Sequence, residues 1–264
     1  MKKIVCLILV AVMLVGALLV TASCGRSKKL ICGVTEYDPM NYRKDGEWVG
    51  FDTEFAKAVG EKLGLEVEFQ MINWGRKFDE LNSGAIDAIW NGFTATASED
   101  GVARIDLCDM SYSYMLNTQC VVVKTSRVSE LSSADALAGK TLAAESGSAG
   151  EEEALGLAGD NGEIIGVIAQ INAFLEVKSG AVDGAVIDLI LAREIAGTGD
   201  YSDLSIAFEL DPEVYAIGFK KGNSLRNDVN KAMVELFEDG TLLQIAKKYG
   251  VDDTLLLDTS FGKK

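Results

Sequence analysis

Short runs typical of β-strands alternate with helical patterns from Leu30 onward, and the alternation starts again near Cys120. Such alternation indicates a mainly parallel sheet with helices on both faces, and its restart predicts two α/β lobes joined by extended segments. The alternative is a single large sheet. Strands are expected at 30–35, 67–72, 85–90, 120–124, 140–144, 164–168 and 183–187, and helices at 53–63, 173–178 and 189–196.

The first helix has readable ends. Phe55, Val59 and Leu63 share one face of it, and Gly64 is a residue type that ends helices. Asp52 precedes this pattern, and aspartate is common at the N-cap. We therefore expect Asp52 to cap this helix.

The first 24 residues have the pattern of an export signal. Lys2 and Lys3 precede an uncharged run that ends in small residues, which are the parts of a secretory signal. The cysteine that follows makes the segment resemble a lipobox, in which Cys24 would carry lipid and begin the mature protein. The alternative is an uncleaved anchor, because 4–23 is about long enough to span a bilayer. In both cases residues 25–29 would form a tether, and the rest of the chain would face outward.

The overall charge excludes several kinds of partner. Loss of residues 1–24 would change the net charge from −15 to −17, with 23 basic side chains against 40 acidic ones. Such a surface repels nucleic acid and anionic lipid, so we expect neither as a partner. The chain also lacks histidine, which excludes Ser-His and Cys-His nucleophilic sites and most zinc sites. We expect no metal and no cofactor.

Three cysteines belong to the body of the protein. Cys32, Cys108 and Cys120 are an odd number and lack the spacing of metal ligands. A disulfide between the last two is one alternative in an exported protein. Buried free thiols are the favoured interpretation.

Ligands of open α/β sheets bind beyond the carboxyl ends of the strands. This rule selects four places in the sequence. They are Glu36 and Tyr37 after the first strand, Asn91, Gly92, Phe93 and Thr94 after the third, the loop 145–150, and Asp188 after the strand 183–187.

Two of the selected residues also have a purely structural explanation. Ser148 with Glu151 fits a helix capping box, and the same loop leaves backbone N–H groups at a helix N-terminus that can hold a carboxylate. Asp188 is likewise a residue type common at the N-cap. On sequence alone, capping is the favoured role for Ser148 and for Asp188.

Several segments that follow one another along the chain carry a resemblance to a known family. They are "GVTEYDPMNY", "DGEWVGFDTEFAKAVGEKLGLEVEF", "INWGRKFDELNSGAIDAIWNGFT", "LAGKTLAAESGS", "SGAVDGAVID", "YAIGFKKGN" and "FEDGTLLQIAKKYG". Together they resemble the polar amino-acid-binding family (family 3) of ABC-transporter extracellular solute-binding proteins.

The resemblance implies an α/β fold of two lobes with two hinge crossovers, the type II periplasmic-binding-protein-like fold. The first lobe would contain 30–118 and 214–264, and the second would contain 119–213. The ligand would lie between the lobes, which would close on it.

The resemblance also implies roles for first-lobe residues at matching positions. Tyr37 and Trp74 would flank the ligand side chain with their aromatic faces. Asn91, Gly92 and Thr94 would hydrogen-bond the ligand.

From the second lobe, the resemblance implies contacts to the α-amino-acid frame. Ser148 and the neighbouring amides would hold the α-carboxylate, and Asp188 would pair with the α-ammonium group. Capping and ligand binding need not exclude each other at these residues.

The family's carboxylate-binding arginine is displaced in this chain. It normally stands three residues after the threonine that matches Thr96, where this sequence has Glu99. Counting back from "DMSYSY", which resembles the family's "DFS-x-PY", places it at Arg104 and implies an insertion within 97–103. We expect Arg104 to bind the α-carboxylate. The alternative is that Arg104 lies on the surface and the carboxylate clamp is lost or rebuilt.

The implied function is capture of a polar amino acid by lobe closure and its delivery to an ABC-transporter permease. The protein would be a monomeric lipoprotein on the outer face of the cell membrane or in the periplasm. One alternative is an enzyme on the same scaffold, similar to the cyclohexadienyl dehydratases, with Glu36 or Glu145 as acid or base. Another is a ligand-sensing ectodomain. The same two glutamates would favour a cationic ligand unless they face solvent.

Overall fold

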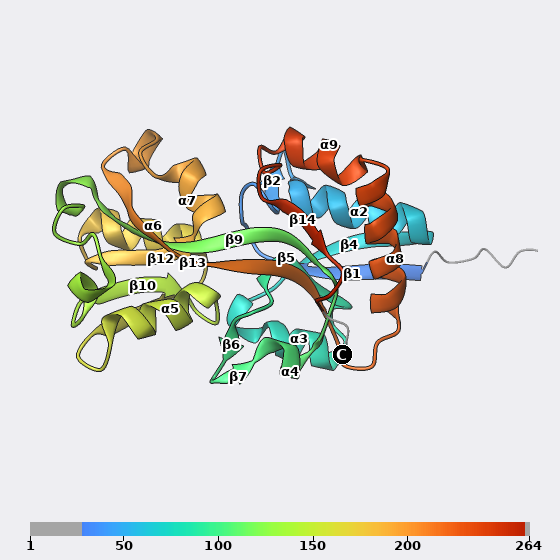
Figure 1. Cartoon of the computed structure of the whole chain (residues 1–264), viewed down its shortest axis with the longest axis horizontal. Helices are drawn as coiled ribbons and strands as arrows, with labels where there is room; N and C mark the ends of the chain where they lie inside the picture. The colour runs from blue at the N-terminus through green and yellow to red at the C-terminus, as the bar shows by residue number, and fades with distance from the viewer. Residues whose placement is uncertain (1–27, 262–264) are drawn as a thin grey trace, which may run out of the picture.

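The computed structural model describes residues 28–261. Two lobes lie side by side, and two long strands run from one lobe into the other (Figure 1). The predicted signal 1–24, with Cys24, lies outside the described residues. Of the predicted tether, Lys28 and Lys29 belong to the first strand instead. No helix within 28–261 is long and apolar enough to cross a membrane.

The elements follow one another along the chain in three groups. The first group contains β1 (Lys28–Val34), β2 (Tyr42–Lys44), β3 (Glu47–Val49), α2 (Phe51–Leu63), β4 (Leu65–Met71), η1 (Trp74–Arg76), α3 (Lys77–Ser83), β5 (Ala88–Thr94), β6 (Ser98–Glu99), β7 (Val102–Ala103), α4 (Arg104–Leu107) and β8 (Asp109–Met110). The second contains β9 (Ser113–Lys124), η2 (Thr125–Arg127), η3 (Ala134–Leu137), β10 (Thr141–Glu145), α5 (Ala149–Ala158), β11 (Glu163–Val167), α6 (Gln170–Ser179), β12 (Gly184–Asp188), α7 (Leu189–Ile195) and η4 (Gly199–Tyr201). The third contains β13 (Leu204–Phe219), α8 (Leu225–Glu238), α9 (Thr241–Lys248) and β14 (Leu255–Asp258).

Each lobe is built on parallel strands, as the alternation predicts. In the first lobe β1 lies between β4 and β5 and pairs in parallel with both. Helix α2 connects β1 to β4 and packs against α8 and α9, which the chain adds from its C-terminal end (Figure 1). In the second lobe β10 lies between β11 and β12, again in parallel, and α5 and α6 pack against it.

Strands β9 and β13 join the lobes. They pair antiparallel over most of their length, from Leu204 with Lys124 to Tyr215 with Met115. At one end β9 pairs with β12, and at the other β13 pairs with β5. The hydrogen-bonded path β11-β10-β12-β9-β13-β5-β1-β4 is therefore continuous, although its parallel strands fall into two separate groups. The predicted lobe boundaries, at 118/119 and 213/214, fall within these two strands.

The start of helix α2 differs from the prediction. Its N-cap is Gly50, and no side chain caps it. Asp52 lies inside the first turn and is fully buried, and its Oδ2 accepts hydrogen bonds from Gly92 N at 2.7 Å and from the Tyr114 hydroxyl at 3.0 Å. The prediction that Asp52 caps α2 is wrong, because its carboxylate pairs with β5 and β9 instead of the N-terminal amides of the helix.

Strand β5 continues to Thr94, beyond its predicted end. Asn91, Gly92, Phe93 and Thr94 therefore lie within the strand and not in a loop after it. The reason is the pairing with β13, which places Tyr215 opposite Thr94. A sequence cannot show that a partner from the far end of the chain will keep these residues extended.

The cysteines follow the favoured prediction. Cys32, Cys108 and Cys120 are buried and free. Burial raises the pKa of the Cys108 thiol to about 12, so this thiol stays protonated and packs as a small apolar group.

Candidate functional site

Side chains from both lobes enclose a small pocket at the carboxyl ends of β5, β10 and β12. The space between them is about 10 Å³, roughly what one water molecule requires. All predicted ligand-binding residues except Tyr37 line it. The lining residues are Trp74, Asn91, Gly92, Thr94 and Arg104 from the first lobe, and Glu145, Ser148, Ala149, Gln170 and Asp188 from the second.

Strand β5 forms one wall, and hydrogen bonds behind it fix its position. The Asn91 Oδ1 accepts hydrogen bonds from Thr35 N at 3.0 Å and Asn41 Nδ2 at 2.8 Å, and Asn91 Nδ2 donates to Thr35 Oγ1 at 2.7 Å. These bonds hold the Asn91 side chain within the first lobe. The hydroxyl of Thr94 donates to Glu213 Oε1 at 2.9 Å.

Gly92 has no acceptable replacement in this wall. Its φ is +57°, and a Cβ at this position would come within 2.5 Å of the Tyr37 ring. Only glycine combines this backbone conformation with such close packing. Tyr37 therefore lies behind the wall, and its hydroxyl shares a hydrogen bond of 2.7 Å with the Tyr215 hydroxyl.

Trp74 lies at the start of η1 and on the pocket wall. Its ring meets that of Phe93 edge to face, with the centroids 6.0 Å apart. Packing of this kind fixes the orientation of the indole.

Arg104 is fully buried and begins helix α4, directly after the β6–β7 hairpin. The residues that the sequence predicts as an insertion form this hairpin, and they leave the arginine at the pocket. Its Nη1 donates to Thr94 O at 3.0 Å and its Nη2 to Gly147 O at 2.9 Å. Among the described residues its Nε has no hydrogen-bond partner. The alternative of a surface arginine is therefore wrong.

Lys77 lies beside Arg104 and was not predicted. Its Nζ donates to Glu99 Oε2 at 2.7 Å and to Gly147 O at 2.8 Å. Burial and the charge of Arg104 lower the pKa of Lys77 to about 8, against the opposing effect of Glu99. Glu99, which occupies the family's usual arginine position, thus serves as the counter-ion of the buried lysine.

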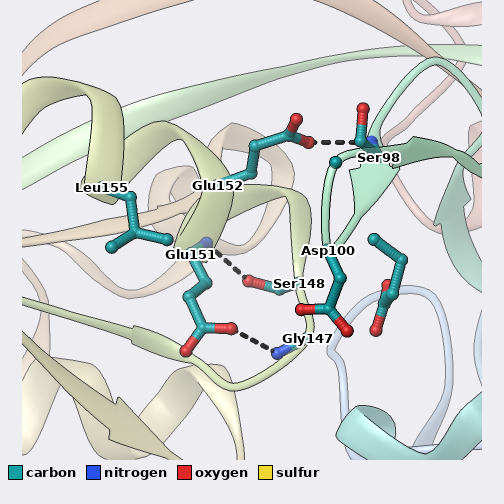
Figure 2. A pocket seen from close by; sticks show the side chains of 9 residues that line it. Ser98, Asp100, Gly147, Ser148, Glu151, Glu152 and Leu155 are labelled. Carbon is teal, nitrogen blue, oxygen red and sulfur yellow. Dashed lines mark hydrogen bonds between the residues drawn. The ribbon is translucent and has the colours of Figure 1, made fainter.

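A second hollow of about 160 Å³ lies beside the pocket, between the β6–β7 hairpin and the start of α5. Figure 2 shows its walls. Ser98 N of the hairpin donates to Glu152 Oε2 of α5 at 2.8 Å, which links the two lobes. Ser148 Oγ accepts a hydrogen bond from Glu151 N at 3.0 Å, so its predicted capping role is confirmed.

Asp188 stands at the N-cap of α7, but its side chain makes no cap hydrogen bond. Its carboxylate instead accepts hydrogen bonds from the Tyr215 hydroxyl at 2.8 Å, from Gln119 Nε2 at 2.7 Å, and from the side-chain amides of Asn117 and Gln170. The prediction of a capping side chain is wrong at this residue. Burial raises the pKa of Asp188, and these donors oppose the rise.

The two glutamates that the sequence suggested as acids lie in different surroundings. Glu36 is exposed, and its Oε2 accepts a hydrogen bond from Arg43 N at 3.2 Å. Glu145 is buried at the end of β10 and lines the pocket. Burial, followed by the charge of Asp188, raises its pKa to about 8, while Lys77 lowers it.

Some residues around the pocket were not singled out in the sequence. Gln170 begins α6 just after β11, so the rule about carboxyl ends could have selected it. Asn117, Gln119 and Glu213 come from the two strands that join the lobes. Only the pairing of those strands brings them to Asp188, and no sequence signal indicates it.

These features define a class of protein. The pocket is enclosed, its walls come from two lobes, and a pair of long strands connects them. A ligand can enter such a pocket only when the lobes separate. The fold and the site are those of a two-lobed solute-binding protein.

Comparison with known proteins shows the family. The sequence pattern of the bacterial extracellular solute-binding proteins, family 3, matches residues 30–252. The arginine-binding extracellular protein ArtP of Bacillus subtilis (strain 168) is 31% identical over 255 residues, 92% of this chain and 96% of ArtP. The L-cystine-binding protein TcyA of the same strain is 32% identical over 221 residues, 82% of this chain and 79% of TcyA.

Comparison with solved structures points to the same family. An ancestral arginine-binding protein bound to arginine matches with a TM-score of 0.78 at 32% identity, over 84% of this chain and 97% of that chain. The chain belongs to the bacterial extracellular solute-binding proteins, family 3, and is the amino-acid-binding component of an ABC uptake transporter. The predicted fold and class of function are thereby confirmed, and the chain is a binding protein and not an enzyme.

Proposed function

We propose that the protein holds a free α-amino acid between its lobes, with the α-carboxylate on Arg104 and the α-ammonium group on Asp188. The observation that carries this proposal is that both residues line one enclosed pocket and come from opposite lobes. The unpaired Nε of Arg104 offers a further donor to a carboxylate. Each charge-assisted contact contributes about 1.5–3 kcal/mol net.

Around this frame most of the other predicted residues keep the roles that the resemblance implies. Ser148 and the amides that begin α5 support the carboxylate, and Trp74 flanks the side chain. Tyr37, which the resemblance also places beside the ligand, supports the wall from behind Gly92 instead. Asn91, Gly92 and Thr94 contact the ligand along β5.

Binding by closure follows from the geometry. The pocket is too small and too enclosed for an amino acid to diffuse into it as it stands. The Gly147 carbonyl accepts hydrogen bonds from Arg104 and Lys77 of the other lobe, so these contacts must break when the lobes separate. A ligand with a charge partner on each lobe favours the closed state because only closure completes both contacts.

Delivery to a permease and a lipid anchor at Cys24 complete the proposal. A monomer tethered to the outer face of the membrane, or within the periplasm, stays close to the transporter that receives its ligand. We expect the mature protein to begin at a lipidated Cys24. Mass spectrometry of the N-terminus checks this, and an intact Met1 would contradict it.

A thermal-shift screen tests the proposal. The full-length protein, purified in mild detergent, is heated with each of the common amino acids, with arginine and cystine included because relatives are named for them. A ligand at 100 times its dissociation constant should stabilise the protein by about 2.7 kcal/mol. The absence of a shift with every amino acid would reject the proposed function.

A further inference from the structure

Glu145 is a buried carboxyl group with an unpaired oxygen. It ends β10, is 4% exposed and lines the pocket. Within residues 28–261 its Oε1 has no hydrogen-bond partner. A buried acceptor without a partner lowers the stability of the folded protein, and does so more when it is charged. Because Glu145 also lines the pocket, a bound ligand can supply the missing partner.

The neighbouring acidic groups differ from Glu145 in this respect. Asp188 accepts hydrogen bonds from four side chains. Glu213 accepts them from Thr94, Asn117 and Gln119. Glu99 accepts one from Lys77. Of these acids, Glu145 is the one that lines the pocket and has a buried oxygen without a hydrogen-bond partner among the described residues.

The positive charges near the pocket have partners other than Glu145. Lys77 Nζ is held by Glu99 and by the Gly147 carbonyl. Arg104 donates to Thr94 O and Gly147 O. Neither cation forms an ion pair with Glu145 within 4.0 Å in the described chain. The residue can therefore accept a positively charged group from a ligand.

We propose that Glu145 selects the ligand side chain, and that the ligand is an amino acid with a cationic side chain. This inference rests on the proposed function, because Arg104 and Asp188 must hold the α-amino-acid frame for the side chain to reach Glu145. The three charges of such a ligand then each meet an opposite charge. A neutral side chain of the same shape offers Glu145 no opposite charge.

The protonation of Glu145 gives this selectivity a dependence on pH. Its pKa is raised to about 8 by burial and by Asp188, against Lys77, and Arg104 is the other charged residue on the pocket wall. A cationic ligand favours the ionised carboxylate, so binding releases a proton below that pKa. Affinity for a cationic ligand should rise between about pH 6 and pH 8, and affinity for a neutral one should not.

Arginine and citrulline are suitable probes because they have nearly the same shape and differ in charge. Their affinities for the full-length protein in mild detergent are measured by calorimetry, together with those of Glu145→Gln and of the matched control Glu36→Gln. We expect the wild type to prefer arginine by roughly ten- to a hundredfold, which corresponds to one charge-assisted hydrogen bond. Glu145→Gln should remove most of that preference, and Glu36→Gln should keep it.

Other results would contradict either the role of Glu145 or the proposed function as a whole. Equal wild-type affinities for arginine and citrulline, or an unchanged preference in Glu145→Gln, would overturn the role of Glu145 while amino-acid binding itself stands. Failure of every amino acid to bind would overturn the proposed function and this inference with it. If Glu145→Gln does not fold, the wild-type protein alone decides, because equal affinities for arginine and citrulline contradict the inference.

Discussion

The two lobes bring opposite charges to one pocket. The first lobe contributes Arg104, and the second contributes Asp188 and Glu145. A ligand with only one sign of charge finds its partners on one lobe, whereas an α-amino acid carries both signs and bridges the two. The difference between the lobes therefore explains how the site can couple recognition to closure.

The lobes also differ in how they hold their binding groups. The first lobe uses a strand and the β6–β7 hairpin, which place Arg104 beside β5. The second uses the ends of β10 and β12 and the capped start of α5. Strand β5 is fixed by buried hydrogen bonds from several elements, whereas the loop before α5 is fixed by its cap and by contacts across the cleft. We expect the two walls to respond differently to substitution.

The largest effect is expected for Arg104→Ala on the first wall. Removal of one partner of a buried charge pair costs about 2–5 kcal/mol, so affinity for the amino acid should fall roughly 30-fold or more. Calorimetry measures this, with Arg76→Ala as the control, because Arg76 is an exposed arginine whose ion pair is with Asp79. Arg104→Lys should recover part of the affinity, because lysine keeps the positive charge but cannot donate two parallel hydrogen bonds to the carboxylate. An unchanged affinity in Arg104→Ala would place the carboxylate elsewhere.

A smaller effect is expected for Gly147→Ala at the contact between the lobes. Its φ is +75°, and an added Cβ would come within 2.8 Å of Gly75 Cα. Crowding of this kind costs about 1–3 kcal/mol, so binding should weaken roughly tenfold as closure is hindered. Gly46→Ala is the matched control, because Gly46 also has a positive φ but has open space around it. Equal affinities in the two variants would show that the lobes do not need to meet at Gly147.

The smallest effect is expected for Ser148→Ala on the second wall. Loss of the cap should lower stability by about 1 kcal/mol, and loss of the hydroxyl should weaken binding roughly fivefold. Denaturant unfolding and calorimetry measure the two effects. Ser133→Ala is the control, because Ser133 is also an N-cap residue but makes no cap hydrogen bond. If the two variants have the same free energy of unfolding, the Ser148 cap does not stabilise α5.

The sequence predicts some features of the two walls and misses others. Periodicity predicts the parallel strands of both lobes, and the resemblance identifies Arg104 from a motif that follows the insertion. The role of Asp52 escapes prediction, because the aspartate that caps a helix and the aspartate that binds buried groups have the same sequence signature. The extension of β5 and the donors to Asp188 escape it as well, since they depend on pairing between residues that are distant in the chain.

The most direct measurement of amino-acid capture between the lobes is a crystal structure of the protein with bound arginine. We predict the α-carboxylate within hydrogen-bond distance of the Arg104 guanidinium, and the α-ammonium group within the same distance of the Asp188 carboxylate. An arginine that contacts only one lobe, or that lies with its ammonium group toward Arg104, would contradict binding by bridging the two charges.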